Sequence, residues 1–158
     1  MNTNVIIKVA EPEDGHVISD ILSSAFQEFK EKYTAGAYNA TVISSEEAVL
    51  RMEKGICWIA YLNNKPVATV SGKITSGSFY IQGMGARPEA RGYKIAYLLL
   101  QKIEEYAIEN NCSALLLSST PYLKKAIFLY DKFGFKIVND GPYDLFKTPL
   151  FTMKKILE

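Results

Sequence analysis

The chain has 158 residues and a formal net charge of +1 at pH 7, with 48% hydrophobic and 22% charged residues. This length suffices for one domain with a full core, and this composition is typical of globular proteins rather than disordered ones. The balanced charge argues against a nucleic-acid or anionic-membrane partner. No run of about 18 apolar residues could span a bilayer, and residues 1–4 lack the regions of a signal peptide. A cytoplasmic location is therefore expected.

The first quarter of the chain is predicted to form a strand followed by a helix. Val5 to Val9 is the expected strand. Asp14 is expected to cap the helix, because its carboxylate can accept from free N–H groups of the first turn. Apolar residues then recur at helical spacing: Val17, Ile18, Ile21, Leu22, Ala25, Phe26 and Phe29. The segment from Lys30 to Ile43 has no clear period, and no element is predicted there.

A short helix and an antiparallel meander are predicted next. The helix covers Glu46 to Lys54, is capped by Ser44 or Ser45, and ends at Gly55. Three strands follow, joined by two tight turns. In chain order these strands and turns are Ile56–Leu62, Asn63-Asn64, Lys65–Ile74, Ser76-Gly77 and Phe79–Ala86.

The second half is predicted to continue the sheet through a crossover. A long amphipathic helix is expected from about Gly92 to Asn110. The continuous apolar run Ala114 to Leu117 suits a strand buried on both faces. The remaining elements are a helix at Tyr122–Lys132 and strands at Phe135–Val138 and Leu150–Lys154. This order predicts one domain over residues 1–158, of class α/β (α+β), with a mixed central sheet of about six to seven strands and helices on both faces.

The turn from Ala86 to Ala96 is the most informative segment of the chain. It joins an expected strand to an expected helix, so several free backbone N–H groups meet the positive end of the helix dipole there. Arg91 adds charged donors at the same point. The turn lacks the glycine and lysine pattern of a P-loop and the glycine pattern of a dinucleotide fold. It predicts a site for a phosphorylated ligand.

Two sequence blocks carry a resemblance to a known superfamily. Residues 91–96 (RGYKIA) resemble the acetyl-CoA-binding signature of the GNAT N-acetyltransferases: Arg or Gln, two residues, Gly, one residue, then Gly or Ala. Lys94 stands where the signature has its middle glycine. Residues 126–135 (AIFLYDKFGF) resemble the family's Ala-…-Leu-Tyr-…-Gly-Phe segment. Three further segments are similar to a little-characterised bacterial subgroup: Tyr33-Thr34, Ser119-Thr120-Pro121 and Thr148-Pro149-Leu150.

The resemblance implies an N-acetyltransferase that moves an acetyl group from acetyl-CoA to a primary amine by direct attack in a ternary complex. The amides of Gly92 to Ala96 would receive the cofactor pyrophosphate. For Lys94, a contact with phosphate and a side chain pointing to solvent both remain open. The implied cofactor-binding residues are Met84, Gly85, Ala86, Arg91, Gly92, Tyr93, Lys94, Ile95, Ala96 and Tyr130.

The resemblance also implies how the chemistry would work. The strand over residues 80–86 would splay from its neighbour, so that its free backbone pairs with the cofactor. Gly83 and Gly85 within this strand indicate a bulge or a close backbone approach. The amide of Met84 would polarise the thioester carbonyl. Tyr130 would protonate the leaving thiolate, since an ordinary phenol has a pKa of about 10 and is protonated at neutral pH.

The general base and the acceptor are not fixed by the sequence. Many relatives carry a glutamate near the position of Gln82 or Gly83, and neither residue can take a proton from an ammonium. The candidate acceptor-site residues are Glu28, Tyr33, Gln82 and Ser119. For Glu28 a solvated helix face is the simpler explanation. The partner expected is a small-molecule or peptide amine. A homodimer, another acyl group, a non-catalytic acyl-CoA-binding or sensing module, and a cofactor-free interaction domain remain alternatives.

No metal site is expected. Cys57 and Cys112 are far apart in apolar surroundings and are interpreted as buried free thiols. His16 is the only histidine and is expected in the first turn of a helix. Trp58 is expected in the core.

Overall fold

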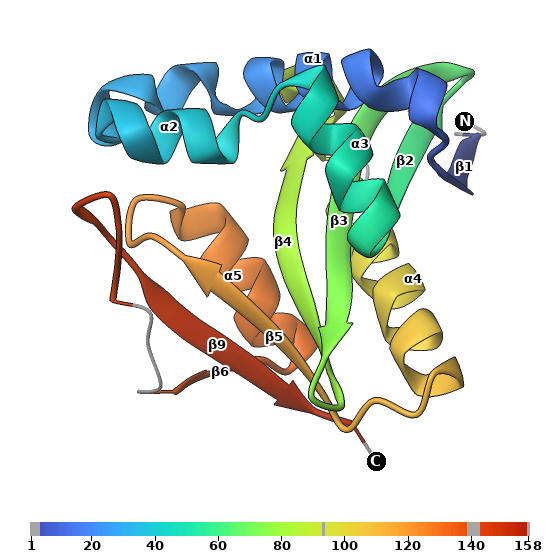
Figure 1. Ribbon diagram of the computed structural model, residues 1–158, viewed down its shortest axis with the longest axis vertical. Coiled ribbons are helices and arrows are strands. Elements are labelled where there is room, and N and C mark those ends of the chain that lie inside the picture. The colour runs from blue at the N-terminus through green and yellow to red at the C-terminus, as the bar shows by residue number, and fades with distance from the viewer. Residues whose placement is uncertain (1–3, 93, 139–142, 158) are drawn as a thin grey trace.

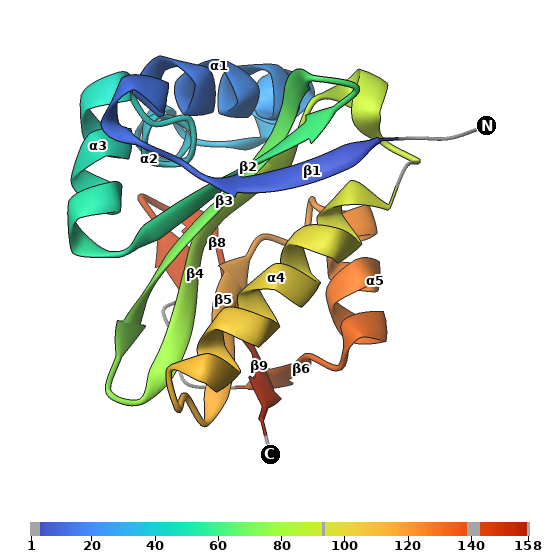
Figure 2. The same ribbon diagram turned by 90° about the vertical axis from the view of Figure 1, so that its right-hand side faces the viewer.

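The computed structural model describes residues 4–92, 94–138 and 143–157 (Figures 1 and 2). A seven-stranded sheet runs in the order β1-β2-β3-β4-β5-β9-β6, and β7 and β8 form a separate two-stranded sheet. The strands are β1 Val5–Val9, β2 Ile56–Leu62, β3 Lys65–Thr75, β4 Ser78–Ala86, β5 Ala114–Ser119, β6 Lys136–Val138, β7 Asp144–Leu145, β8 Thr148–Pro149 and β9 Phe151–Ile156. The helices are α1 Gly15–Phe26, α2 Ala35–Thr41, α3 Ser45–Lys54, α4 Ile95–Glu109 and α5 Lys124–Phe133, with 3-10 turns η1 Pro12–Asp14, η2 Gln27–Lys32 and η3 Pro88–Ala90.

Helices cover both faces of the large sheet, so the predicted fold class is confirmed (Figure 2). Strand β2 is apolar throughout because successive side chains enter opposite cores. Trp58 and Ala60 join the core under α4 and α5, whereas Cys57 and Ile59 join the core under α1 and α3. Trp58 packs edge-on against Tyr106 of α4, with ring centroids 5.3 Å apart.

The meander has the predicted strand order. β1 to β4 pair antiparallel in chain order, and β4 then pairs parallel with β5 across the α4 crossover. Both predicted tight turns are present, and residues such as Asn63 and Gly77 adopt positive φ in them. The closing pair is also confirmed, with β9 inserted between β5 and β6.

The prediction that the segment from Lys30 to Ile43 lacks an element is wrong. α2 forms there because the Thr34 hydroxyl accepts a hydrogen bond from the Ala37 N–H at 3.2 Å. The Thr34 hydroxyl also donates to the Phe146 carbonyl at 2.7 Å, which ties α2 to the β7–β8 turn. This long-range partner carries no local sequence signal.

Three predicted helix ends also need correction. The Asp14 carboxylate does not cap α1; it accepts from the N–H of Glu11 at 2.9 Å within the η1 turn. The α1 helix ends at Phe26, so Phe29 lies in η2 rather than in the helix. The long helix begins at Ile95 instead of Gly92, because Gly92 and Lys94 both have positive φ and cannot continue a right-handed helix.

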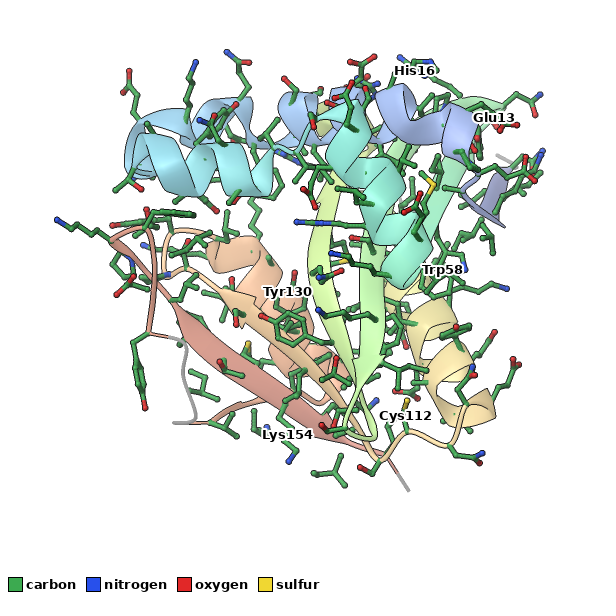
Figure 3. All side chains as sticks on the ribbon, viewed as in Figure 1. Glu13, His16, Trp58, Cys112, Tyr130 and Lys154 are labelled. Carbon is green, nitrogen blue, oxygen red and sulfur yellow. The ribbon has the colours of Figure 1, made fainter. Side chains whose placement is uncertain are left out.

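The cap of α3, the two cysteines and His16 are as expected. The Ser44 hydroxyl caps α3 by accepting from the Glu47 N–H at 3.1 Å. Cys57 and Cys112 are buried free thiols. His16 is exposed on α1 (Figure 3). Within the described part of the chain, no helix is both long and apolar enough to cross a membrane.

Candidate active site

An opening in the large sheet begins halfway along β4. The parallel pairing of β4 with β5 ends at Ile81 and Leu117, but β4 continues to Ala86 beside β3 alone. β5 meanwhile continues to Ser119 beside β9. The two strands therefore separate, as the family resemblance implies, and Figure 1 shows them diverging.

A β-bulge at Gln82 reorients β4 where the opening begins. Ser71 of β3 lies opposite Gly83 and Gly72 lies opposite Ile81, so Gln82 is the extra residue. One extra residue exchanges the faces of the strand. Before the bulge Ile81 belongs to the core under α4, and after it Met84 packs against that same core.

The two glycines of β4 now face α1 and α3. A Cβ on Gly85 would lie 3.0 Å from the Ala25 Cβ, so a side chain at this position would require α1 to shift by a few tenths of an ångström. A Cβ on Gly83 would lie 3.1 Å from Nη1 of Arg51. The sequence prediction of a bulge and a close approach in this strand is confirmed.

The backbone of β4 offers donors to the opening. The Arg87 N–H donates to the Val67 carbonyl of β3 at 2.8 Å. Because N–H groups of alternate residues in a strand point to opposite edges, those of Met84 and Ala86 point away from β3. On that side β5 has already diverged, so these two groups face the space between the strands.

A second set of backbone donors lies at the start of α4. First-turn N–H groups, among them those of Ile95 and Ala96, have no acceptor inside the helix. Gly92 has a φ of +94°, and nothing lies within 4 Å of a Cβ built there, so the approach is open. Lys94 has a φ of 58° and is exposed. Tyr93 lies outside the described residues.

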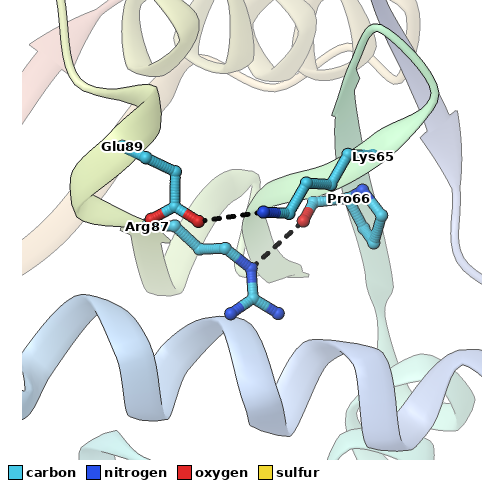
Figure 4. A network of polar contacts seen from close by, with 4 residues as sticks. All are labelled: Lys65, Pro66, Arg87 and Glu89. Carbon is cyan, nitrogen blue, oxygen red and sulfur yellow. Dashed lines mark hydrogen bonds and ion pairs between the residues drawn. The ribbon is translucent and has the colours of Figure 1, made fainter.

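Polar contacts hold the turn between β4 and α4 against the start of β3 (Figure 4). Nε of Arg87 donates to the Pro66 carbonyl at 3.1 Å, and Lys65 pairs with Glu89 at 3.2 Å. Hydrogen bonding to its own backbone and the contact with Lys65 lower the pKa of Glu89. These contacts orient the donors at the start of α4.

Arg91 is joined to the first helical layer. Its Nη1 forms an ion pair with Glu28 of η2, and its Nη2 donates to the Ala25 carbonyl at 3.0 Å. The two side chains line an open pocket of about 440 Å³, together with Ser24, Gln27 and Pro88. Glu28, predicted on the acceptor side, thus lies beside the predicted phosphate-binding arginine.

Tyr130 of α5 is seen through the opening between β4 and β5 in Figure 3. It is 8% exposed and belongs to the core cluster that contains Ile81 and Leu117, the last residues paired across the two strands. Its ring packs against Phe135 at 5.9 Å between centroids. Burial, and to a lesser extent the nearby Tyr33, raises its pKa, so the phenol is neutral across the physiological range.

Hydroxyl groups cluster near the same end of β5. The Thr120 hydroxyl is buried and makes no hydrogen bond of normal geometry among the described residues, but it interacts with the nearby Tyr33 hydroxyl. Burial raises the pKa of Tyr33, and this interaction partly lowers it. Tyr80 and Ser118 share a hydrogen bond of 3.1 Å across the paired part of β4 and β5. An unpaired buried hydroxyl is costly unless a ligand or water satisfies it.

The structure brings the predicted residues into two groups and adds two residues that the sequence analysis missed. One group follows β4 and β5 with Tyr130 and Ser119, and the other surrounds Arg91 at the start of α4. These two residues are Thr120, whose hydroxyl becomes buried only when the chain folds, and Arg51 of α3, whose side chain reaches β4 from a distant part of the sequence. Because helix α3 is predicted from the sequence, the arginine within it was the one signal that could have pointed to Arg51.

Known proteins define the class of this fold. The family model described as the acetyltransferase (GNAT) family matches residues 17–135. The PaiA N-acetyltransferase of Thermoplasma acidophilum, solved in complex with coenzyme A, has a TM-score of 0.84 at 15% identity, covering 98% of this chain and 99% of that one. A GNAT-family acetyltransferase of Staphylococcus aureus has a TM-score of 0.79 at 20% identity, covering 98% and 100%. The ribosomal-protein-S18-alanine N-acetyltransferase of Escherichia coli has a TM-score of 0.72 at 14% identity, covering 98% and 95%.

Since the family model spans more than half of the chain, the protein belongs to the GNAT acetyltransferase family. The resemblance seen in the sequence is confirmed, and acetyl-CoA is the cofactor of this family. No significant match was found among the curated proteins.

Proposed function

We propose that the protein transfers an acetyl group from acetyl-CoA to an amine. The observation that carries the proposal is the open edge of β4, where the Met84 N–H faces a space that a buried phenol, Tyr130, adjoins. This combination offers a donor for a developing oxyanion and a neutral acid beside it. We propose that the chain forms one domain, since a single sheet contains every strand except β7 and β8.

The residues present fit acetyl-CoA. The unpaired N–H groups after the bulge can hydrogen-bond an extended chain such as pantetheine, as an added strand would. The first-turn donors of α4, approached over Gly92, suit the pyrophosphate.

The proposed mechanism needs no covalent enzyme intermediate. Acetyl-CoA would supply the acetyl thioester, which an uncharged amine would attack at the carbonyl carbon. The Met84 N–H would donate to the carbonyl oxygen as negative charge develops there. The Tyr130 hydroxyl would give its proton to the sulfur as the carbon–sulfur bond breaks, the surplus amine proton would pass to water, and water would return a proton to Tyr130. Both cysteines are buried, and burial raises the pKa of Cys57 to about 11, which disfavours a thiolate nucleophile.

The proposal is tested by measuring release of the CoA thiol from acetyl-CoA with a mixed panel of amino acids, amino-acid amides, polyamines and short peptides. Amine-dependent thiol release with a matching acetylated product supports acetyl transfer. Binding of acetyl-CoA without turnover of any amine contradicts it.

A non-catalytic acyl-CoA-binding or sensing module is the second candidate. The observation that favours it is the bulge, which carries Gln82 and Gly83 and offers no carboxylate as a base. Retained acetyl-CoA binding with no amine acetylated would select this candidate.

We further propose that the acceptor is a small-molecule or peptide amine and that the protein forms a homodimer. The edge strand β6 and the end of β9 support a dimer contact, because Ile137 and Ile156 are 60% and 61% exposed there. Sedimentation of the purified chain tests this: a monomer at all concentrations would contradict the dimer.

A further inference from the structure

Arg51 reaches from α3 across the sheet to the bulge of β4. Its Nη1 lies 3.4 Å from the Ser71 hydroxyl of β3 and 3.1 Å from the position that a Cβ on Gly83 would occupy. The guanidinium therefore fills the space into which a side chain at position 83 would point. This is the stretch of β4 at which the parallel pairing with β5 has just ended.

The charge of Arg51 has no carboxylate counterpart at close range. None of the ion pairs among the described residues includes Arg51, and Glu47, one turn earlier on α3, interacts only electrostatically. The side chain is half-buried, and this burial lowers its pKa. A guanidinium nevertheless remains protonated at neutral pH. A desolvated, unpaired cation is costly and is stabilised by an anion that brings its own hydrogen-bond acceptors.

The sheet residues beside this cation are uncharged, and Glu47 of its own helix is the carboxylate that acts on it electrostatically. Gln82 and Gly83 form the bulge, and Ser71 supplies the only side-chain hydrogen bond that Arg51 makes among the described residues. The face of β4 that carries Gly83 is opposite the face that carries Met84 and packs on the core under α4. A ligand that contacts Arg51 thus lies across β4 from that core, at the edge where the Met84 N–H emerges.

We propose that Arg51 binds a carboxylate of the acceptor, so that the acceptor is a small amino-carboxylate such as a free amino acid. This inference rests on the proposed acetyl transfer. A planar guanidinium fork fits a carboxylate in two parallel hydrogen bonds. In an amino acid the amine is only two bonds from the carboxylate carbon, so anchoring at Gly83 keeps the amine near the adjoining edge of β4.

The test compares each of the twenty amino acids with its carboxamide, which keeps the amine and removes the negative charge. The proteins are the wild type, Arg51→Gln, Arg51→Lys, and Lys54→Gln. Lys54 is exposed on the same helix, so Lys54→Gln removes the same charge without touching β4. Acetyl transfer is followed by thiol release, and binding is followed by thermal unfolding with saturating CoA.

We expect the wild type to prefer at least one acid over its amide by tenfold or more in kcat/KM. Arg51→Gln should lower that ratio at least tenfold, Arg51→Lys should lower it less, and Lys54→Gln should preserve it. Equal use of acid and amide by the wild type, a preference for peptides or polyamines, or an unchanged ratio in Arg51→Gln would overturn the proposal.

The unfolding arm separates this proposal from acetyl transfer itself. An acid that stabilises the wild type but not Arg51→Gln, without any turnover, would retain the carboxylate site and contradict the transferase. Turnover of amines without any Arg51-dependent stabilisation by an acid would retain the transferase and overturn the carboxylate site.

Discussion

Tyr130 is a buried phenol next to the place where β4 leaves β5. Tyr130→Phe removes only this hydroxyl, so we expect kcat to fall by about 10²-fold or more while the KM for acetyl-CoA changes little. Steady-state kinetics measure this. Tyr106→Phe is the matched control, because Tyr106 packs on Trp58 and Phe79 in the core. Equal losses in both variants would refute a catalytic hydroxyl.

Burial of the Cys57 thiol makes the free energy of unfolding depend on pH in the alkaline range. Its pKa rises from 9.0 to about 11 in the folded chain because burial disfavours the thiolate. The unfolded state therefore loses its proton first as the pH rises, so stability is complete below pH 9 and declines between pH 9 and 11. The decline is about 1.4 kcal/mol per pH unit for one proton. Urea unfolding of the wild type and Cys57→Ala across this range measures it, and identical slopes would contradict it.

The Thr34 hydroxyl both caps α2 and ties this helix to the β7–β8 turn. Thr34→Ala removes the cap of α2 and the hydrogen bond to the Phe146 carbonyl, and we expect a loss of about 1–2 kcal/mol in unfolding free energy. Thr41→Ala is the control, because the Thr41 hydroxyl only bonds back to the Ala37 carbonyl within the helix. Urea unfolding that shows the same cost for both variants would disprove the tie between α2 and the β7–β8 turn.

In the proposed complex, helix α1 and η2 would compete with a cofactor phosphate for Arg91. The guanidinium pairs with the exposed Glu28 carboxylate, a contact worth at most about 1 kcal/mol at the surface. Glu28→Gln frees the guanidinium, so the Kd for acetyl-CoA should fall by a factor of up to about five. Titration calorimetry measures the change. Glu31→Gln removes a similarly exposed carboxylate that has no ion pair among the described residues, and an equal effect there would indicate net charge rather than this pair.

At the level of elements, the sequence predicts those helices and strands that are determined by local periodicity and by turn residues. The meander and its two tight turns follow from apolar runs separated by Asn-Asn and Ser-Gly pairs, and the α4 crossover follows from a helical period of apolar residues. α2 escapes prediction because its cap is stabilised by Phe146, over 100 positions away. The start of α4 is misplaced because a lysine at positive φ gives no local signal where glycine is usual.

The candidate site is predicted in part for the same reason. Met84, Tyr130 and the amides near Gly92 belong to contiguous blocks that resemble the family signatures. Arg51 and Thr120 become candidates only once the chain is folded. The Arg51 side chain then reaches from α3 to β4, and the Thr120 hydroxyl is then buried. No spacing in the chain relates these two residues to Gly83 or Tyr33.

At the scale of the molecule, the site follows from the topology. A parallel β4–β5 pair needs a crossover, which places the start of α4 beyond the far end of β4. Beyond their paired part, β4 continues beside β3 and β5 continues beside β9, so β4 and β5 separate. The opening between them and the donors at the start of α4 therefore both lie near the end of β4. A single extended ligand with an anionic group and a thioester end fits both.

The central claim is that this opening and the start of α4 hold acetyl-CoA, and thermal unfolding with acetyl-CoA tests it most directly. At about 100 times Kd the ligand should stabilise the fold by roughly 2.7 kcal/mol, or about 5–10 °C for a chain of this size. Arg91→Ala should reduce the shift, whereas Lys102→Ala, on the middle of α4, should preserve it. The absence of any shift in the wild type with acetyl-CoA or CoA would contradict the account.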